Sequence, residues 1–98
     1  MSPVHDLPCY LAEWYLPAIT NAPLGPTAAT LDEAAAVINA QGSPVHLLSM
    51  LSVPSDEVLF GVFEAASERA VAQTCDRAGM PVQRLTAARS VPRSASFG

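Results

Sequence analysis

The spacing of apolar residues changes repeatedly along the chain, and each change marks an expected element. Alternating or continuous apolar runs, which are typical of strands, occupy 9–16, 45–53, 57–65 and, less regularly, part of 81–91. Apolar residues recur every three or four positions at 30–42 and 67–79, as they do on the buried side of a helix. The predicted order is therefore strand, helix, strand, strand, helix, strand.

This order predicts the fold class. Two strand–helix–strand halves of this length close into one antiparallel sheet of four strands, with both helices on one face. We therefore expect an α+β, ferredoxin-like βαββαβ fold. A chain of 98 residues has room for one domain, which we place at 9–91, with terminal tails at 1–8 and 92–98.

Capping residues set the expected helix boundaries. Thr30 and Glu33 have the spacing of a capping box, so the first helix is expected to begin there and to end near Gly42. Ser67 is the expected N-cap of the second helix, and Gly79 is its expected end. Before the first helix, 18–26 contains two prolines, a glycine and an asparagine, which predicts a loop over one end of the sheet, and loops of this length often shape a pocket mouth.

Composition and charge exclude several classes of protein. The net charge is −4 and no basic stripe is interleaved with aromatic residues, so the sequence predicts no nucleic-acid binding. No apolar run is long enough for a bilayer, so no membrane segment is expected. Cys9 and Cys75 do not form a CxxC pair, which favours free thiols and a cytoplasmic location.

The two middle strands are apolar on both faces, which predicts a partner. In 45–53, Val45, Leu47 and Leu51 alternate with Leu48 and Met50. The helices account for one face, and the other would leave a larger apolar patch than soluble monomers usually expose. We therefore expect a homodimer in which two sheets pack face to face as a dimeric α/β barrel, with a cavity between the subunits.

Polar residues within these apolar strands are the candidates for a site. Glu13, His46 and Cys9 carry the donor atoms that a metal ion needs, and Glu13 is in addition hard to explain by packing. Trp14 and Tyr15 follow Glu13 and point to opposite sides of their strand. They are the candidates for lining the ligand cavity, and we expect one of the two to lie in the core.

Two other residues have structural expectations. Glu64 lies near a strand end and is expected to be solvated, and Cys75 is expected to be a small core residue. No catalytic triad, phosphate-binding glycine loop or metal-binding HExxH helix is present in the sequence. The absence of such motifs favours a binding protein over an enzyme.

Three segments resemble the signatures of a known family. Tyr10–Pro17, Val62–Ala65 and Ala78–Pro81 are similar to segments of a family of small bacterial ferredoxin-like proteins of unknown function, some of which are named nickel-binding protein. The resemblance implies a ferredoxin-like fold, a dimer and, in some members, a bound metal. Family members often carry a cysteine in the third strand and a histidine in the second helix, where this chain has Gly61 and Thr74.

The sequence thus favours a small dimeric binding protein. Its ligand would be either a divalent transition metal such as nickel or a small apolar molecule in the cavity between the sheets. The alternative is an enzyme of the cofactor-free monooxygenase or isomerase type, which rests on analogy with other dimeric α/β barrels.

Overall fold

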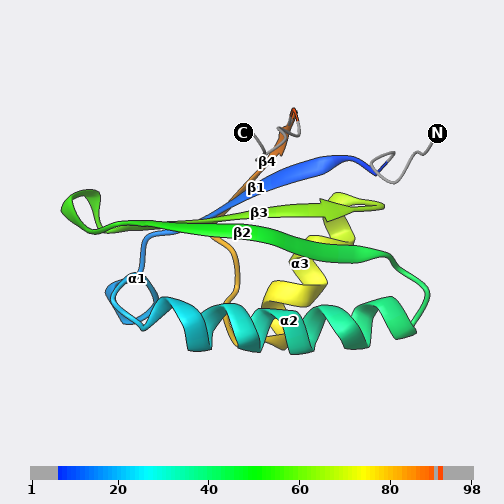
Figure 1. The fold of residues 1–98 in the computed structure, drawn as a ribbon, viewed down its shortest axis with the longest axis horizontal. Coiled ribbons are helices and arrows are strands. Elements are labelled where there is room, and N and C mark those ends of the chain that lie inside the picture. The colour runs from blue at the N-terminus through cyan, green and yellow to red at the C-terminus, as the bar shows by residue number, and fades with distance from the viewer. Residues whose placement is uncertain (1–6, 90, 92–98) are drawn as a thin grey trace, which may run out of the picture.

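The computed structural model describes residues 7–89 and 91 (Figure 1). Its elements are β1 (Cys9–Trp14), α1 (Pro17–Thr20), α2 (Leu24–Ala40), β2 (Val45–Val53), the 3₁₀ helix η1 (Pro54–Asp56), β3 (Val58–Ala65), α3 (Glu68–Arg77) and β4 (Arg84–Ala88). The strands form one antiparallel sheet in the order β2-β3-β1-β4. Helices α2 and α3 both lie on one side of it, below the sheet as drawn in Figure 1. The predicted α+β, ferredoxin-like architecture is confirmed.

The start of α2 differs from the prediction. The helix begins at Leu24, and Thr30 is an interior residue whose hydroxyl donates to the Pro26 carbonyl at 3.0 Å instead of capping the helix. Pro26 is tolerated because it sits in the first turn, where the missing amide would have no intrahelical partner. The short helix α1 (Pro17–Thr20) takes up the first three residues of the expected loop 18–26.

Other boundaries follow the sequence closely. The Ser67 hydroxyl accepts a hydrogen bond from the Ala70 amide at 3.1 Å, which confirms it as the N-cap of α3. Gly42 and Gly79 follow the two long helices with φ of 99° and 76°, a left-handed conformation that glycine adopts at little cost. The first strand ends at Trp14, two residues earlier than expected. The next amide, that of Tyr15, donates to the side-chain oxygen of Gln83 and not to a neighbouring strand.

The core lies between the helices and the face of the sheet that carries Ala12 and Trp14. Trp14 is fully buried, and its indole Nε1 donates to the main-chain oxygen of Met80 at 2.8 Å. Gly61 pairs with Ala12, and a Cβ at Gly61 would lie 3.1 Å from an indole carbon of Trp14. Only glycine therefore fits beneath the indole without a shift. The remaining buried residues of this cluster are Leu31, Ala35, Ile38, Val45, Leu59, Phe63, Ala65, Ala70, Val71, Cys75 and Met80.

A β-bulge changes the faces predicted for β2. The pairing register with β3 shifts between Leu47 and Ser49, so Leu47 and Met50 both pack against the core. Leu51 then lies opposite Phe60 and is 62% exposed. The expectation from strict alternation, that Leu51 shares a face with Val45 and Leu47, is wrong because one extra residue inverts the pattern beyond the bulge.

Candidate functional site

The face of the sheet turned away from α2 and α3 forms an apolar surface. We call it the open face, and the register places on it the side chains of Leu11, Leu51, Val53, Val58, Phe60 and Val62. Polar residues lie at both ends of this surface. Toward one end, β1 and β4 contribute Glu13 and Arg84, and toward the other, the row across β2, β3 and β1 contains His46, Glu64 and Cys9.

Glu13 is the best-defined polar group of the open face. It lies in a central strand, is only 9% exposed, and stands directly opposite Arg84 of β4. Its Oε1 accepts a hydrogen bond from the Tyr15 hydroxyl, and its Oε2 lies 3.7 Å from Arg84 Nε. A carboxylate in apolar surroundings needs such partners, because burial without them costs several kcal/mol, on the order of 2–7 even for a neutral polar group.

The same contacts change the properties of Tyr15. Its hydrogen bond to Glu13, together with partial desolvation and the negative charge of that carboxylate, raises the pKa of the phenol above its ordinary value. The hydroxyl of Tyr15 is the donor in this hydrogen bond. Tyr15 is 43% exposed and Arg84 has a 67% exposed side chain, so both remain accessible from solvent.

The predicted metal ligands do not form one cluster. His46 and Cys9 flank Glu64 in one cross-strand row, but Glu13 is four residues from Cys9 along β1, a separation of about 13 Å at the rise of a strand. Within the part of the chain that the structure describes, no group of three or more His, Cys, Asp or Glu side chains is placed to hold a metal ion. Glu64 is 9% exposed, so the expectation that it is solvated is wrong.

The positions that correspond to family metal ligands lie on the other side of the sheet. Gly61 is covered by the indole of Trp14, and Thr74 is fully buried with its hydroxyl donating to the Ala70 carbonyl at 2.9 Å. Cys75 is also buried, and burial raises the pKa of its thiol to about 12. Of the two aromatic residues predicted to line a ligand cavity, Trp14 belongs to this core, whereas Tyr15 is exposed beside the open face.

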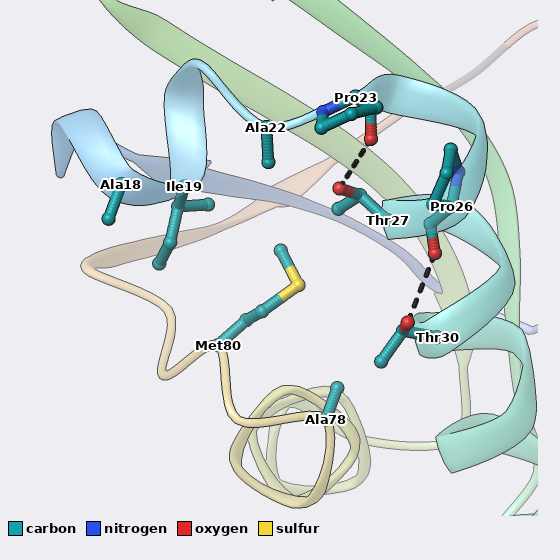
Figure 2. Close-up of a pocket in the computed structure, with 9 residues that line it drawn as sticks. All are labelled: Ala18, Ile19, Ala22, Pro23, Pro26, Thr27, Thr30, Ala78 and Met80. Carbon is teal, nitrogen blue, oxygen red and sulfur yellow. Dashed lines mark hydrogen bonds between the residues drawn. The ribbon is translucent and has the colours of Figure 1, made fainter.

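A separate pocket lies on the helix side of the molecule (Figure 2). It has a volume of about 300 Å³ and is formed by α1, the first turns of α2 and the turn after α3. Its lining residues are Ala18, Ile19, Ala22, Pro23, Pro26, Thr27, Thr30, Ala78 and Met80. Residues of 18–26 thus line a pocket, but the segment is largely helical and is not the predicted loop. The sequence contained no signal that Ala78 and Met80 would complete it.

The comparison with known proteins supports the fold. No family model matches the chain, and no curated protein matches its sequence. The crystal structure of SCO4226 from Streptomyces coelicolor A3(2) is similar, with a TM-score of 0.61, 18% sequence identity, and coverage of 89% of this chain and 99% of that chain. At this identity the likeness shows a shared fold and assigns no functional residue. Among the described helices, none combines the length and hydropathy that a transmembrane span requires.

Proposed function

We propose that the protein is a homodimeric binding protein whose subunits pack through their open faces and hold a small ligand between the two sheets. The observation that carries the proposal is the open face itself, an apolar surface that contains a buried carboxylate bonded to an exposed phenol. A dimer would cover the apolar part, and the polar part would contact the ligand.

The apolar part supports the dimer. Leu51 is 62% exposed, and it lies beside Phe60 and near Val62 on adjacent strands of one face. Contiguous apolar surface of this kind is favourable to bury, at about 25 cal/mol per Å² of area removed from water. A two-fold axis through this face would bring identical apolar strips together, which is the usual geometry of a symmetric dimer.

The polar part supports a ligand with an apolar body and a neutral polar end. Glu13 and Arg84 neutralise each other, so the cluster has no net charge to attract an ion. The Tyr15 oxygen can accept a further hydrogen bond, and the remaining guanidinium N–H groups of Arg84 can donate. Ligand binding is favoured over acid–base catalysis, because the raised pKa of the phenol moves away from neutral pH.

The test of the dimer is the molar mass in solution, measured by light scattering after size exclusion. We expect wild-type protein to elute as a dimer and Leu51→Glu to elute as a monomer, because the substitution places a charge in the buried interface. Ala29→Glu, on the exposed side of α2, is the matched control and is expected to stay dimeric. A monomeric wild type at every concentration overturns the dimer.

The ligand is tested separately by native mass spectrometry of the purified protein. We expect a co-purified neutral molecule that is retained by wild type and lost from Tyr15→Phe and Glu13→Gln. Retention by both variants would remove this cluster as the binding site. A dimer without any bound molecule would overturn the ligand half of the proposal and leave the interface standing.

Metal binding is a second candidate. Within the described part of one subunit no three donors are placed to hold a metal ion, so the row of His46, Glu64 and Cys9 would need donors from a second subunit. Imidazole, carboxylate and thiolate suit a divalent transition metal such as nickel, and a second subunit would add donors. Calorimetric titration with nickel tests it, with stoichiometric binding expected for wild type and loss in His46→Ala. Unchanged affinity in that variant overturns His46 as a ligand.

The free thiols of Cys9 and Cys75 support a cytoplasmic location within the same proposal.

A further inference from the structure

We propose that the pocket between α1, α2 and the turn after α3 is a binding site for an uncharged aromatic molecule of one or two rings. The site is independent of the open face, because its lining residues lie on the helix side of the molecule (Figure 2). It therefore goes beyond the function proposed for the dimer interface.

The volume of the pocket fits such a ligand. The pocket measures about 300 Å³. An apolar cavity of roughly 150 Å³ in another protein stays dry and binds benzene, so twice that volume is adequate for one or two fused rings. Small-molecule sites start at about 300 Å³, which places this pocket at the lower end of their range.

The chemistry of the lining favours uncharged ligands. None of the nine residues that line the pocket in the described chain is ionisable. Its two hydroxyl groups already donate to main-chain oxygens, Thr27 to Pro23 at 2.7 Å and Thr30 to Pro26 at 3.0 Å. Figure 2 shows both hydroxyls directed along α2 toward these carbonyls. A charged group seated against this lining would lose part of its hydration and find no side chain of opposite charge, which is unfavourable.

Met80 makes the pocket suited to an aromatic ring. Its thioether extends from the turn after α3 to the space between α1 and α2 in Figure 2, with Ile19 and Thr27 on either side. A methionine side chain is flexible and polarisable, so it adapts to a bound molecule and makes a favourable sulfur–aromatic contact. The rings of Pro23 and Pro26 add apolar surface without an amide donor.

Occupancy of this pocket should be visible at two built-in reporters. The single tryptophan of the chain, Trp14, donates its indole hydrogen bond to the main-chain oxygen of Met80 at 2.8 Å. A shift of Met80 therefore changes the surroundings of the indole. The Met80 methyl group reports directly, and Met50, which does not line this pocket, serves as an internal control in the same spectrum.

The experiment is a titration with toluene, followed by NMR of protein labelled with ¹³C at the methionine methyl groups. We expect a saturable shift of the Met80 signal, assigned with Met80→Leu, while the Met50 signal stays in place. Benzoate and benzylammonium, which have the same ring and a charge, are expected to leave Met80 unshifted at equal concentration. An absent or non-saturable toluene response overturns the site, and an equal response to benzoate overturns the ligand class.

Matched variants fix the location of binding. Ala22→Leu fills the pocket and should abolish the toluene shift, and Ala78→Leu does so from the opposite wall if the first variant fails to fold. Ala29→Leu adds the same volume on the exposed side of α2 and should bind like wild type. The Leu51→Glu variant should also bind toluene, so a failed dimer and a failed pocket give different results. Binding that survives both pocket-filling substitutions overturns the proposal.

Discussion

The two faces of the sheet are built from equally apolar strands, yet they satisfy their polar groups in different ways. On the helix-covered face, the indole of Trp14 bonds to the main-chain oxygen of Met80, far away in the sequence. On the open face, the carboxylate of Glu13 accepts a hydrogen bond from the Tyr15 hydroxyl and forms an ion pair with Arg84, and both of these partner side chains are exposed. A main-chain partner fixes the fold, whereas exposed side-chain partners can exchange with a ligand.

The contrast is sharpest between neighbours in β1. Glu13 and Trp14 are adjacent in sequence and point to opposite faces, because successive side chains alternate along a strand. Trp14 is fully buried by this chain alone, while Glu13 is surrounded by apolar groups that this chain leaves partly uncovered. A polar residue in an apolar strand is therefore informative only when the face on which it lies is known.

The largest effect that the comparison predicts is at Trp14. Trp14→Ala should lower the free energy of unfolding by about 3–5 kcal/mol, because it empties a packed site and leaves the Met80 carbonyl without its donor. Tyr15→Ala should cost far less, because the phenol is exposed and its hydrogen bond to Glu13 is made at the surface. Urea denaturation followed by circular dichroism measures both. Equal losses would contradict the assignment of Trp14 to the core and Tyr15 to the surface.

A smaller effect is expected beneath the same indole. Gly61→Ala places a methyl group 3.1 Å and 3.2 Å from two indole carbons of Trp14, and we expect a loss of about 1–3 kcal/mol from overpacking. Gly25→Ala is the matched control, because a Cβ there has nothing within 4 Å. The double variant Gly61→Ala with Trp14→Phe should recover part of the loss, and strict additivity would show that the indole is not the source of strain.

The sequence predicted the sheet better than it predicted the helix start or the site. Apolar periodicity was sufficient for β2, whose bounds match, because strand pattern and burial are linked directly. The sequence did not predict the start of α2. The capping pattern at Thr30 suggested a start there, but the helix extends back through Pro26 to Leu24. The bulge at Leu47 depends on pairing geometry, which alternation does not encode.

The candidate site was predicted in part. Glu13 and Tyr15 stand out because a carboxylate and a phenol lie two residues apart in an otherwise apolar segment. Arg84 was not predicted as part of the site, because it becomes a neighbour of Glu13 only when β4 pairs with β1. One wall of the pocket was missed for the same reason, since Met80 reaches the pocket from the turn after α3, which is far from 18–26 in the sequence. Contacts between distant segments require the fold, and periodicity alone does not provide them.

The two thiols lie on opposite faces of the sheet, and the buried thiol of Cys75 should make the stability of the protein depend on pH. Burial raises the pKa of Cys75 to about 12, so the unfolded thiol ionises at lower pH than the folded one. The folded chain then holds the extra proton, and stability is lost as pH rises from the ordinary thiol pKa, about 8.5, toward 12. We expect wild type to lose roughly 1–2 kcal/mol more than Cys75→Ala between pH 8 and about 10.

Denaturant titrations of wild type and Cys75→Ala at a series of pH values measure this difference. A thiol reagent supplies a second readout, since Cys9 on the open face is half-buried and should react in the folded protein, while Cys75 should react only after unfolding. If the free energy of unfolding depends on pH in the same way in both proteins, or if Cys75 is labelled rapidly under native conditions, the surroundings of Cys75 are open to water.

The smallest expected effect is at the polar end of the open face. The hydrogen bond to Glu13 raises the pKa of Tyr15, so Glu13→Gln should move that pKa back toward its ordinary value. The pKa of Tyr15 is higher in the folded protein than in the unfolded chain. The stability that the protonated phenol contributes is therefore complete below the pKa of the unfolded chain, and it is lost as pH rises through the pKa of the folded protein. Ultraviolet difference titration of the phenolate, in a Tyr10→Phe background that leaves one tyrosine, measures the shift. Glu64→Gln, at the other end of the face, is the matched control. If it lowers the pKa of Tyr15 as much as Glu13→Gln does, the perturbation comes from the general field of the open face and not from the hydrogen bond.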